Sequence, residues 1–310
     1  MPEIAPPEIP GPATPAQARL NHDPPTVASA RLGAKVDVLV GAASIVDGVA
    51  VQYRELGTGM PVLILHGAGV DHREMAAALE PLFTQRPGYR RIYIDLPGMG
   101  GTAAGTVNTN DDVLDLLIGF AGNVIGDDEF LVVGHSYGGY LGQALAHRCA
   151  RVAGLALICA ASDERGEVPE HVVVHASGEL EGRLPPADEA EFRGYFVVQN
   201  AEMLQRFEEA VVPATPLADE SALTRIFEHW RLTNAPEDKQ PFTKPVLILA
   251  GRQDSSVGYA NAWNLVEHYP RATFAVIDRA GHALLHEQEK LVIALMAEWL
   301  DRVQEHRRSS

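Results

Sequence analysis

Short apolar runs recur along most of the chain and alternate with segments in which apolar residues return every three or four positions. The runs have the length of strands, and the intervening segments have the spacing of one helix face. Strands that alternate with helices predict crossover connections, and therefore a mostly parallel sheet with helices on both faces. The expected strands lie near residues 36–40, 49–55, 61–65, 90–95, 130–133, 155–159, 245–250 and 273–277, and the expected helices near 71–85, 110–125 and 140–150.

The first 34 residues differ from the rest of the chain. They contain eight of the 21 prolines and few large apolar residues, and they show no periodicity. Such a segment cannot bury enough surface to offset its chain entropy, so we expect residues 1–34 to form a flexible tail. After it, the turn Asp47-Gly48 separates the first two expected strands, which predicts an antiparallel hairpin at the sheet edge.

The alternation of strands and helices stops between residues 163 and 240. This stretch contains helical patterns near 188–211 and 218–232 and is interrupted by prolines at positions 185, 186 and 213. With 46% hydrophobic residues, the chain can form one buried core and carry an insertion. We expect residues 35–162 and 241–310 to form the core.

The pentapeptide Gly134-His135-Ser136-Tyr137-Gly138 joins the apolar run at 130–133 to the helical pattern at 140–150. A strand that reverses into a helix over so few residues forces the central residue into a strained conformation, and the glycines let strand and helix approach closely. Ser136 is then exposed at the strand end. A Gly/Ser-rich turn without chemistry has the same composition, but the strand-turn-helix context favours a nucleophile.

Two residues that could activate such a serine follow in the sequence. Asp254 and His282 come after the last two expected strands, and open α/β sheets bind ligands beyond the carboxyl ends of their strands. A serine hydroxyl is a weak nucleophile, so we assign His282 as its general base and Asp254 as the acid that orients the imidazole. Asp163, after the strand expected at 155–159, is a competing acid. An ordinary turn residue at 254 and a helix-terminal histidine at 282 are the alternatives without chemistry.

These motifs resemble those of the α/β-hydrolase superfamily, in its capped group of lipases, esterases and peptidases. The His-Gly-Ala-Gly segment at 66–69 is similar to the family's oxyanion loop, and the segment 95–102 is similar to its Asp-x-Pro-Gly-x-Gly-x-Ser loop, with Met99 and Thr102 as departures. The likeness extends from about residue 45 to the end. It implies an α/β-hydrolase fold: an eight-stranded, mostly parallel sheet with helices on both faces and a helical cap formed by residues 163–240.

Attack by a serine also requires stabilisation of the negative charge that develops on the carbonyl oxygen. Preorganised backbone N–H groups supply it, at roughly 3–4 kcal/mol per donor. Tyr137, the residue after the nucleophile, provides one N–H, and the resemblance implies that Ala68 provides the other. The supporting loop consists of His66, Gly67 and Gly69, with the histidine as a structural brace rather than a proton carrier.

We therefore expect a serine hydrolase without a cofactor that cleaves a small ester, thioester, lactone or amide through an acyl-enzyme. An aminopeptidase similar to proline iminopeptidases is one alternative, although the loop at 66–69 differs from that family's His-Gly-Gly-Pro. A ligand-binding receptor that reuses the fold is the alternative of another class. Epoxide hydrolases and haloalkane dehalogenases of this fold need an aspartate where Ser136 stands.

Charge narrows the choice of substrate. The formal net charge is −16, and residues 163–240 alone carry 17 acidic and 7 basic side chains. This excess is either a solvated face or an entrance that repels anions and admits a neutral or cationic acyl substrate.

The absence of a basic stripe argues against nucleic acid as a partner. No apolar run approaches the roughly 20 residues of a membrane span, and the N-terminus lacks the pattern of a secretory signal, so we expect a cytoplasmic protein that does not bind membranes.

Neither the cysteines nor the histidines form a metal-binding pattern. Cys149 and Cys159 are too few for a disulfide framework and are most simply buried free thiols. Histidines at 171 and 175, and at 282 and 286, have i,i+4 spacing but lack the His-Glu-x-x-His pattern and further ligands. We therefore expect no metal site.

Overall fold

The computed structural model describes residues 40–163, 166–178, 180–235 and 241–309. The tail expected at 1–34 lies outside them, as do residues 36–39 of the first expected strand. The strands of the large sheet are β1 (Val40–Val46), β2 (Val49–Leu56), β3 (Met60–Leu65), β4 (Tyr89–Ile94), β5 (Phe130–His135), β6 (Val152–Ile158), β9 (Val246–Gly251) and β10 (Ala272–Ile277). The helical elements joined to them are α1 (His72–Gln85), α2 (Asn110–Val124), α3 (Ser136–Arg148), α7 (Ala260–Asn264), η3 (Leu265–His268), α8 (Leu284–Glu287) and α9 (Glu289–Ser309).

These eight strands form one sheet in the order β1-β2-β4-β3-β5-β6-β9-β10. β1 and β2 are antiparallel, as are β2 and β4, and the remaining neighbours are parallel. The predicted mostly parallel sheet is thus confirmed. The edge hairpin also forms: among the described residues its first strand covers 40–46, and the two-residue Asp47-Gly48 turn sets Val46 directly opposite Val49.

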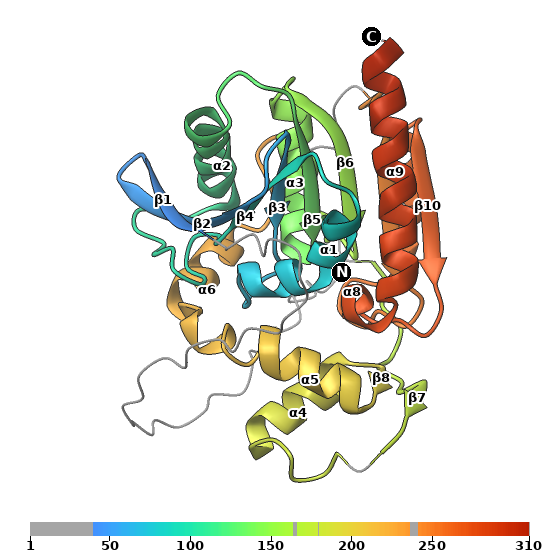
Figure 1. The fold of residues 1–310 in the computed structure, drawn as a ribbon. Helices are drawn as coiled ribbons and strands as arrows, with labels where there is room; N and C mark the ends of the chain where they lie inside the picture. The colour runs from blue at the N-terminus through green and yellow to red at the C-terminus, as the bar shows by residue number, and fades with distance from the viewer. Residues whose placement is uncertain (1–39, 164–165, 179, 236–240, 310) are drawn as a thin grey trace, which may run out of the picture.

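Helices cover both faces of the sheet, with α2 and α3 on one side and α1 and α9 on the other (Figure 1). The alternation of side chains along a strand explains why the buried strands are apolar throughout. In β3, Leu63 and Leu65 belong to the core on the α2/α3 side, whereas Val62 and Ile64 belong to the core on the α1/α9 side.

The segment between β6 and β9 is hereafter called the inserted segment (residues 163–240), and its described residues pack beyond the carboxyl edge of the sheet (Figure 1). It has its own apolar cluster, which includes Phe192, Phe196 and Phe207 and contacts Ala283 of the core. Its described elements are β7 (His175–Ala176), α4 (Pro186–Tyr195), β8 (Val198–Gln199), α5 (Ala201–Ala210), η1 (Thr215–Leu217) and α6 (Glu220–Glu228).

The helical pattern near 188–211 corresponds to two helices, α4 and α5, with a break between them. The backbone N–H groups of Val197 and Val198 donate to the carboxylate of Glu287 at 2.7 and 2.9 Å instead of to a helix carbonyl. Asn200 then caps α5 by accepting the N–H of Met203 at 2.9 Å. A contact from the distant α8 thus breaks a segment whose local pattern is helical.

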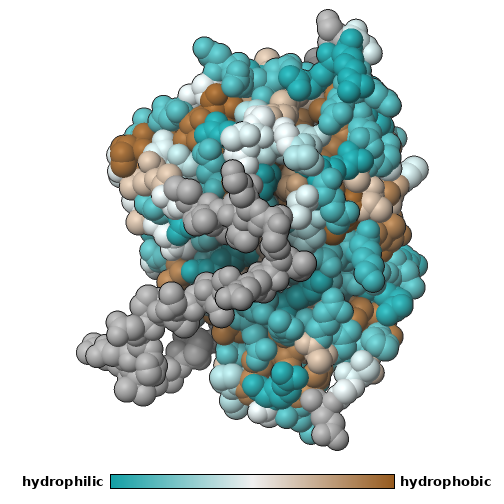
Figure 2. Space-filling view, in the orientation of Figure 1, coloured by the Kyte–Doolittle hydropathy of each residue, from teal (hydrophilic) through white to brown (hydrophobic). Residues whose placement is uncertain are grey.

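None of the described helices combines the length and apolar character needed to cross a membrane. The face of the molecule in Figure 2 is mostly hydrophilic, and its apolar residues form separate patches.

Candidate active site

Ser136 lies at the junction of β5 and α3 and has a φ of 51°, in the left-handed region that non-glycine residues rarely adopt. This backbone is possible because small residues surround it. A Cβ at position 134 would clash with the carbonyl oxygen of Gly138, and a Cβ at position 138 would clash with that of Leu65. The two glycines therefore allow the sharp turn that presents Ser136 at the strand end.

Ser136, His282 and Asp254 form a continuous hydrogen-bonded chain. The Ser136 hydroxyl donates to His282 Nε2 at 2.8 Å, and His282 Nδ1–H donates to Asp254 Oδ2 at 2.9 Å. Asp254 follows β9 and His282 follows β10, so the three loops converge at the carboxyl edge of the sheet. The three residues predicted from the sequence therefore lie close enough to one another for the proton transfers assigned to them.

The environment of Asp254 keeps its carboxylate ionised. Burial raises its pKa, but the charge and N–H of His282, together with backbone donors, outweigh burial and hold the pKa below its usual value. The backbone donors are the N–H groups of Ser256 and Val257, at 2.9 and 3.0 Å from Oδ1. Asp254 thus has one oxygen for its own loop and the other for the histidine.

Asp163, the competing acid, has a different partner. Its carboxylate accepts a short hydrogen bond from the hydroxyl of Tyr140 on α3. The carboxylate that is hydrogen-bonded to His282 is that of Asp254.

The loop expected to supply an oxyanion N–H lies against the Ser136 turn. The carbonyl of His66 accepts the N–H of Gly138 at 3.1 Å, which joins the two segments. Ala68, Ser136 and Tyr137 line the same cavity. Tyr137 belongs to the first turn of α3, where backbone N–H groups have no acceptor within the helix.

The His66 side chain braces this loop from below. Its Nδ1–H donates to the carbonyl of Gly67 at 2.7 Å, and its Nε2 accepts the N–H of Leu96 at 3.0 Å. Burial lowers the pKa of His66 in spite of nearby carboxylates, so the ring is neutral. Both nitrogens are occupied by backbone groups, which leaves no ring nitrogen for a substrate.

A buried ion pair that the sequence analysis missed lies beneath the nucleophile. His135 Nδ1–H donates to Glu74 Oε2 at 3.2 Å, and His135 Nε2–H donates to the backbone carbonyl of His282 at 3.0 Å. Glu74 also accepts the N–H of Gly67 at 3.4 Å and the hydroxyl of Tyr195, from α4, at 3.3 Å. The pair thus contacts the oxyanion loop, the loop of the histidine and the inserted segment.

Charge stabilises both partners of this pair. Burial alone would lower the pKa of His135, but the Glu74 carboxylate raises it above its usual value. Burial would raise the pKa of Glu74, but the charge and N–H of His135 hold it well below its usual value. Glu74 could have been suspected from the sequence, as an acidic residue on the otherwise apolar face of the helix at 71–85.

Glu287 holds the other side of the His282 loop. Its carboxylate accepts the N–H of Gly281 at 2.6 Å, in addition to the N–H groups of Val197 and Val198 at the start of β8. Burial raises the pKa of Glu287 to about 7, against the effect of these three donors. One side chain therefore ties the inserted segment to the residue before His282.

Ser136 opens on a cavity of about 400 Å³, a size suited to a small-molecule group. Three aromatic rings form much of its wall: Tyr137, Phe227 and Trp230, with centroids 5.0 to 5.8 Å apart. Asp163 is the one ionisable acid in the lining, and no Lys or Arg among the described residues lines it. The remaining lining residues are Ala68, Ala161, Ser162, Ser256 and Val257.

Two groups of buried side chains within the described residues have the donor types of a metal site. Asp71, His72 and Asp95 form one, but Asp71 is paired with Arg73 at 2.7 Å and Asp95 accepts from His72 at 2.7 Å. Cys159 lies near His135 and His282 in the other, and burial raises its pKa well above the usual value, so the thiol stays protonated. These groups already serve the protein's own hydrogen bonds.

Residues 62–295 match the model of the family described as the Alpha/beta hydrolase family. The chain belongs to this family. The predicted fold and family are thereby confirmed, and the protein is a hydrolase of the α/β class.

Known members of the family extend the comparison. The chain is 24% identical over 256 residues to 2-hydroxy-6-oxo-6-(2'-aminophenyl)hexa-2,4-dienoic acid hydrolase of Metapseudomonas resinovorans, over 81% of this chain and 87% of the relative. A stretch of 102 residues is 40% identical to 2-succinyl-6-hydroxy-2,4-cyclohexadiene-1-carboxylate synthase of Escherichia coli O8 (strain IAI1), over 31% of this chain and 36% of that enzyme. An alpha/beta superfamily hydrolase from Oenococcus oeni PSU-1 has a similar structure, with a TM-score of 0.77 and 27% identity over 82% of this chain and 96% of that one.

Proposed function

We propose that this α/β hydrolase is a serine hydrolase that cleaves a small ester, thioester, lactone or amide through an acyl-enzyme. The observation that carries the proposal is the hydrogen-bonded chain Asp254–His282–Ser136, which ends on a cavity. A serine whose hydroxyl is held at 2.8 Å from an imidazole nitrogen can lose its proton as it attacks a carbonyl carbon.

In the acylation step, His282 takes the proton of Ser136 while Oγ bonds to the carbonyl carbon of the substrate. Asp254 stabilises the imidazolium that forms and keeps Nδ1 protonated, so that Nε2 is the basic nitrogen. The imidazolium then donates its proton to the leaving group. In the second step, water attacks the acyl-enzyme, with His282 again accepting and returning the proton.

The negative charge of each tetrahedral intermediate lies next to the N–H groups of Ala68 and Tyr137. Two such donors reduce the barrier by several kcal/mol because they are oriented before the charge develops. The Glu74–His135 pair supports this arrangement from beneath, since it holds Gly67 next to Ala68 and the carbonyl of His282.

The lining of the cavity favours a neutral or cationic substrate. The Metapseudomonas resinovorans relative is named for a dienoic acid, whose carboxylate would need a positively charged or strongly hydrogen-bonding partner. The described lining of this cavity offers Asp163 and no Lys or Arg. We therefore favour a carboxylic ester or amide without a negative charge near the scissile bond.

We expect a fluorophosphonate probe to label Ser136 covalently, because only a serine with an adjacent base attacks such phosphorus centres readily. Intact-protein mass spectrometry should show one adduct on the wild type and none on Ser136→Ala. Ser162→Ala, which alters another serine of the same cavity, should still be labelled. If folded wild-type protein resists the probe at neutral pH, the receptor alternative replaces the enzyme. A panel of p-nitrophenyl esters and aminoacyl-naphthylamides then separates esterase from aminopeptidase activity.

We also expect the inserted segment to reduce the approach of anions. Among esters with one acyl group, an anionic leaving group should give a kcat/KM several-fold lower than a neutral one at low salt, because residues 163–240 carry 17 acidic and 7 basic side chains. The gap should shrink at high salt, since the Debye length falls from about 10 Å at 0.1 M to about 3 Å at 1 M. Equal and salt-independent values would mean that these carboxylates only form a solvated surface.

A further inference from the structure

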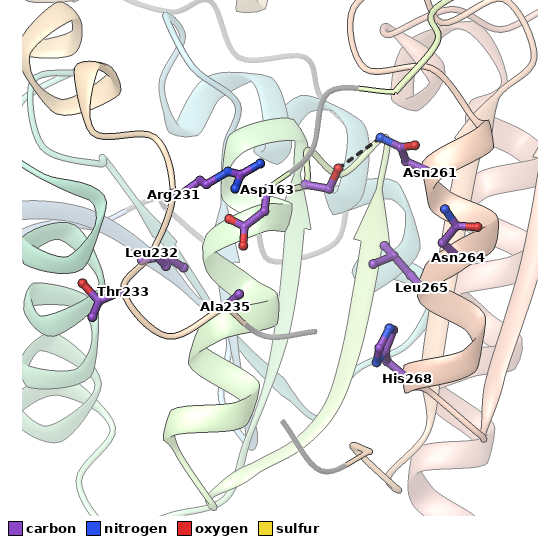
Figure 3. Close-up of a pocket in the computed structure, with 10 residues that line it drawn as sticks. Asp163, Arg231, Leu232, Thr233, Ala235, Asn261, Asn264, Leu265 and His268 are labelled. Atoms are coloured by element: carbon purple, nitrogen blue, oxygen red, sulfur yellow. Dashed lines mark hydrogen bonds between the residues drawn. The ribbon is translucent and has the colours of Figure 1, made fainter. Parts of the chain in front are cut away.

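The carboxylate of Asp163 lies at the junction of two cavities. It lines the cavity of Ser136 and also a neighbouring cavity of about 490 Å³, where Figure 3 shows it with Arg231 and Asn261. Within the described part of the chain, its hydrogen-bond partner is the neutral hydroxyl of Tyr140, and no cation forms an ion pair with it. Asp163 therefore presents a carboxylate that has no ion-pair partner among the described residues to the space in front of the candidate nucleophile.

Aromatic rings with different orientations surround the same space. Trp230 stacks on Tyr140 with an interplanar angle of 12°, while Phe227 meets Trp230 at 70° and Tyr137 at 77°. The ring of Trp230 is fixed, because its Nε1–H donates to the carbonyl of Ser162 at 3.0 Å. Ser162, the residue before Asp163, therefore positions the indole of Trp230 in the cavity wall.

We propose that Asp163, Trp230 and Phe227 form a subsite for an alkylammonium group, so that the substrate is an ester or amide whose acyl part carries a positive charge. The inference rests on the proposed function in treating the ammonium as part of a substrate of Ser136. Aromatic faces attract ammonium groups through their quadrupole, and a carboxylate supplies the counter-charge. A neutral apolar group would pack against the rings but would offer no positive charge to the Asp163 carboxylate.

Two isosteric substrates test the subsite. One is a p-nitrophenyl butanoyl ester with a terminal trimethylammonium group, and the other has a tert-butyl group in place of the ammonium. After each kcat/KM is divided by the rate constant for hydroxide-catalysed hydrolysis, wild type should prefer the cation by about tenfold, as expected for a cation–π contact with a nearby carboxylate. Asp163→Asn keeps an acceptor for Tyr140 and should lower this preference about fivefold, and Trp230→Leu should lower it by a similar factor.

A matched control separates the subsite from the general charge of the inserted segment. Glu208→Gln on α5 removes the same charge from an exposed position. This variant should keep the cation preference of the wild type. If it loses as much of that preference as Asp163→Asn does, the subsite is overturned. Hydrolysis of both esters with no cation preference in wild type would also overturn it and would leave the proposed function intact.

Binding without turnover distinguishes failure of the subsite from failure of the proposed function. Isothermal titration calorimetry on Ser136→Ala should detect butyltrimethylammonium binding that Ser136→Ala/Asp163→Asn weakens about fivefold. If wild type hydrolyses neither ester and resists the fluorophosphonate probe, yet Ser136→Ala binds the ammonium, the proposed function is wrong and the cation site stands. If neither hydrolysis nor binding occurs, the subsite is overturned as well.

Discussion

Asp254→Asn should reduce kcat by about 10⁴ and leave the protein folded, as neutralisation of the acid does in serine hydrolases that have a Ser-His-Asp triad. The structure gives the reason. Oδ1 of Asp254 accepts two backbone N–H groups, so the amide oxygen of the variant must take that place. The amide NH₂ then faces His282 Nδ1 and donates to it. This leaves the proton on Nε2, which can no longer accept the proton of Ser136.

The measurement is kcat on a neutral p-nitrophenyl ester, with circular dichroism to verify that the variant is folded. Asp163→Asn is the control, because it makes the same chemical change on the competing acid, whose carboxylate is bonded to Tyr140. It should retain at least about a tenth of wild-type turnover on this ester, a loss far smaller than the one expected at position 254. If Asp163→Asn is the inactive variant, the assignment of the acid is wrong.

The sheet and the Ser136 turn could be predicted from the sequence because local constraints specify them. Apolar strand-length runs recur at regular intervals, and the glycines at 134 and 138 are required by contacts that any side chain would break. The order serine, acid, histidine along the chain placed each residue after a strand end. Parallel strands bring their carboxyl ends to one edge, so the convergence of the three loops followed from the fold class.

Contacts between distant segments could not be predicted in this way. The break at Val197 and Val198 depends on a carboxylate of α8, about ninety residues away along the chain. The Glu74–His135 pair joins α1 to β5; the helical pattern marks Glu74 as an acid on an apolar face, but it does not indicate His135 as the partner. The aromatic wall of the cavity likewise brings Tyr137 of α3 to Phe227 and Trp230 of the inserted segment. These contacts define the environment of the serine, and they depend on packing.

Glu74→Gln should lower the free energy of unfolding by about 3 kcal/mol near pH 5.5, because removal of one partner of a buried ion pair leaves the other charge uncompensated. The side chains of Glu74 and His135 are each only 2% exposed. In wild type, the raised pKa of His135 contributes stability that is fully present below about pH 6.5 and is lost as pH rises through its folded value. The lowered pKa of Glu74 contributes stability that is present above about pH 4.5 and is lost as pH falls through its folded value. The pair is therefore complete between these limits.

The pH dependence distinguishes this pair from a simple packing defect. In Glu74→Gln, burial favours a neutral His135, whose Nδ1 can accept from the new amide while Nε2–H still donates to the carbonyl of His282. Folding of the variant must then release a proton below about pH 6.5, so the deficit relative to wild type should be smaller at pH 8 than at pH 5.5. Urea unfolding at both pH values measures it. Asp301→Asn, which breaks the exposed pair with Arg86, is the control and should cost less than about 1 kcal/mol at either pH. A Glu74→Gln deficit that is the same at both pH values would show that His135 carries no charge in the native protein.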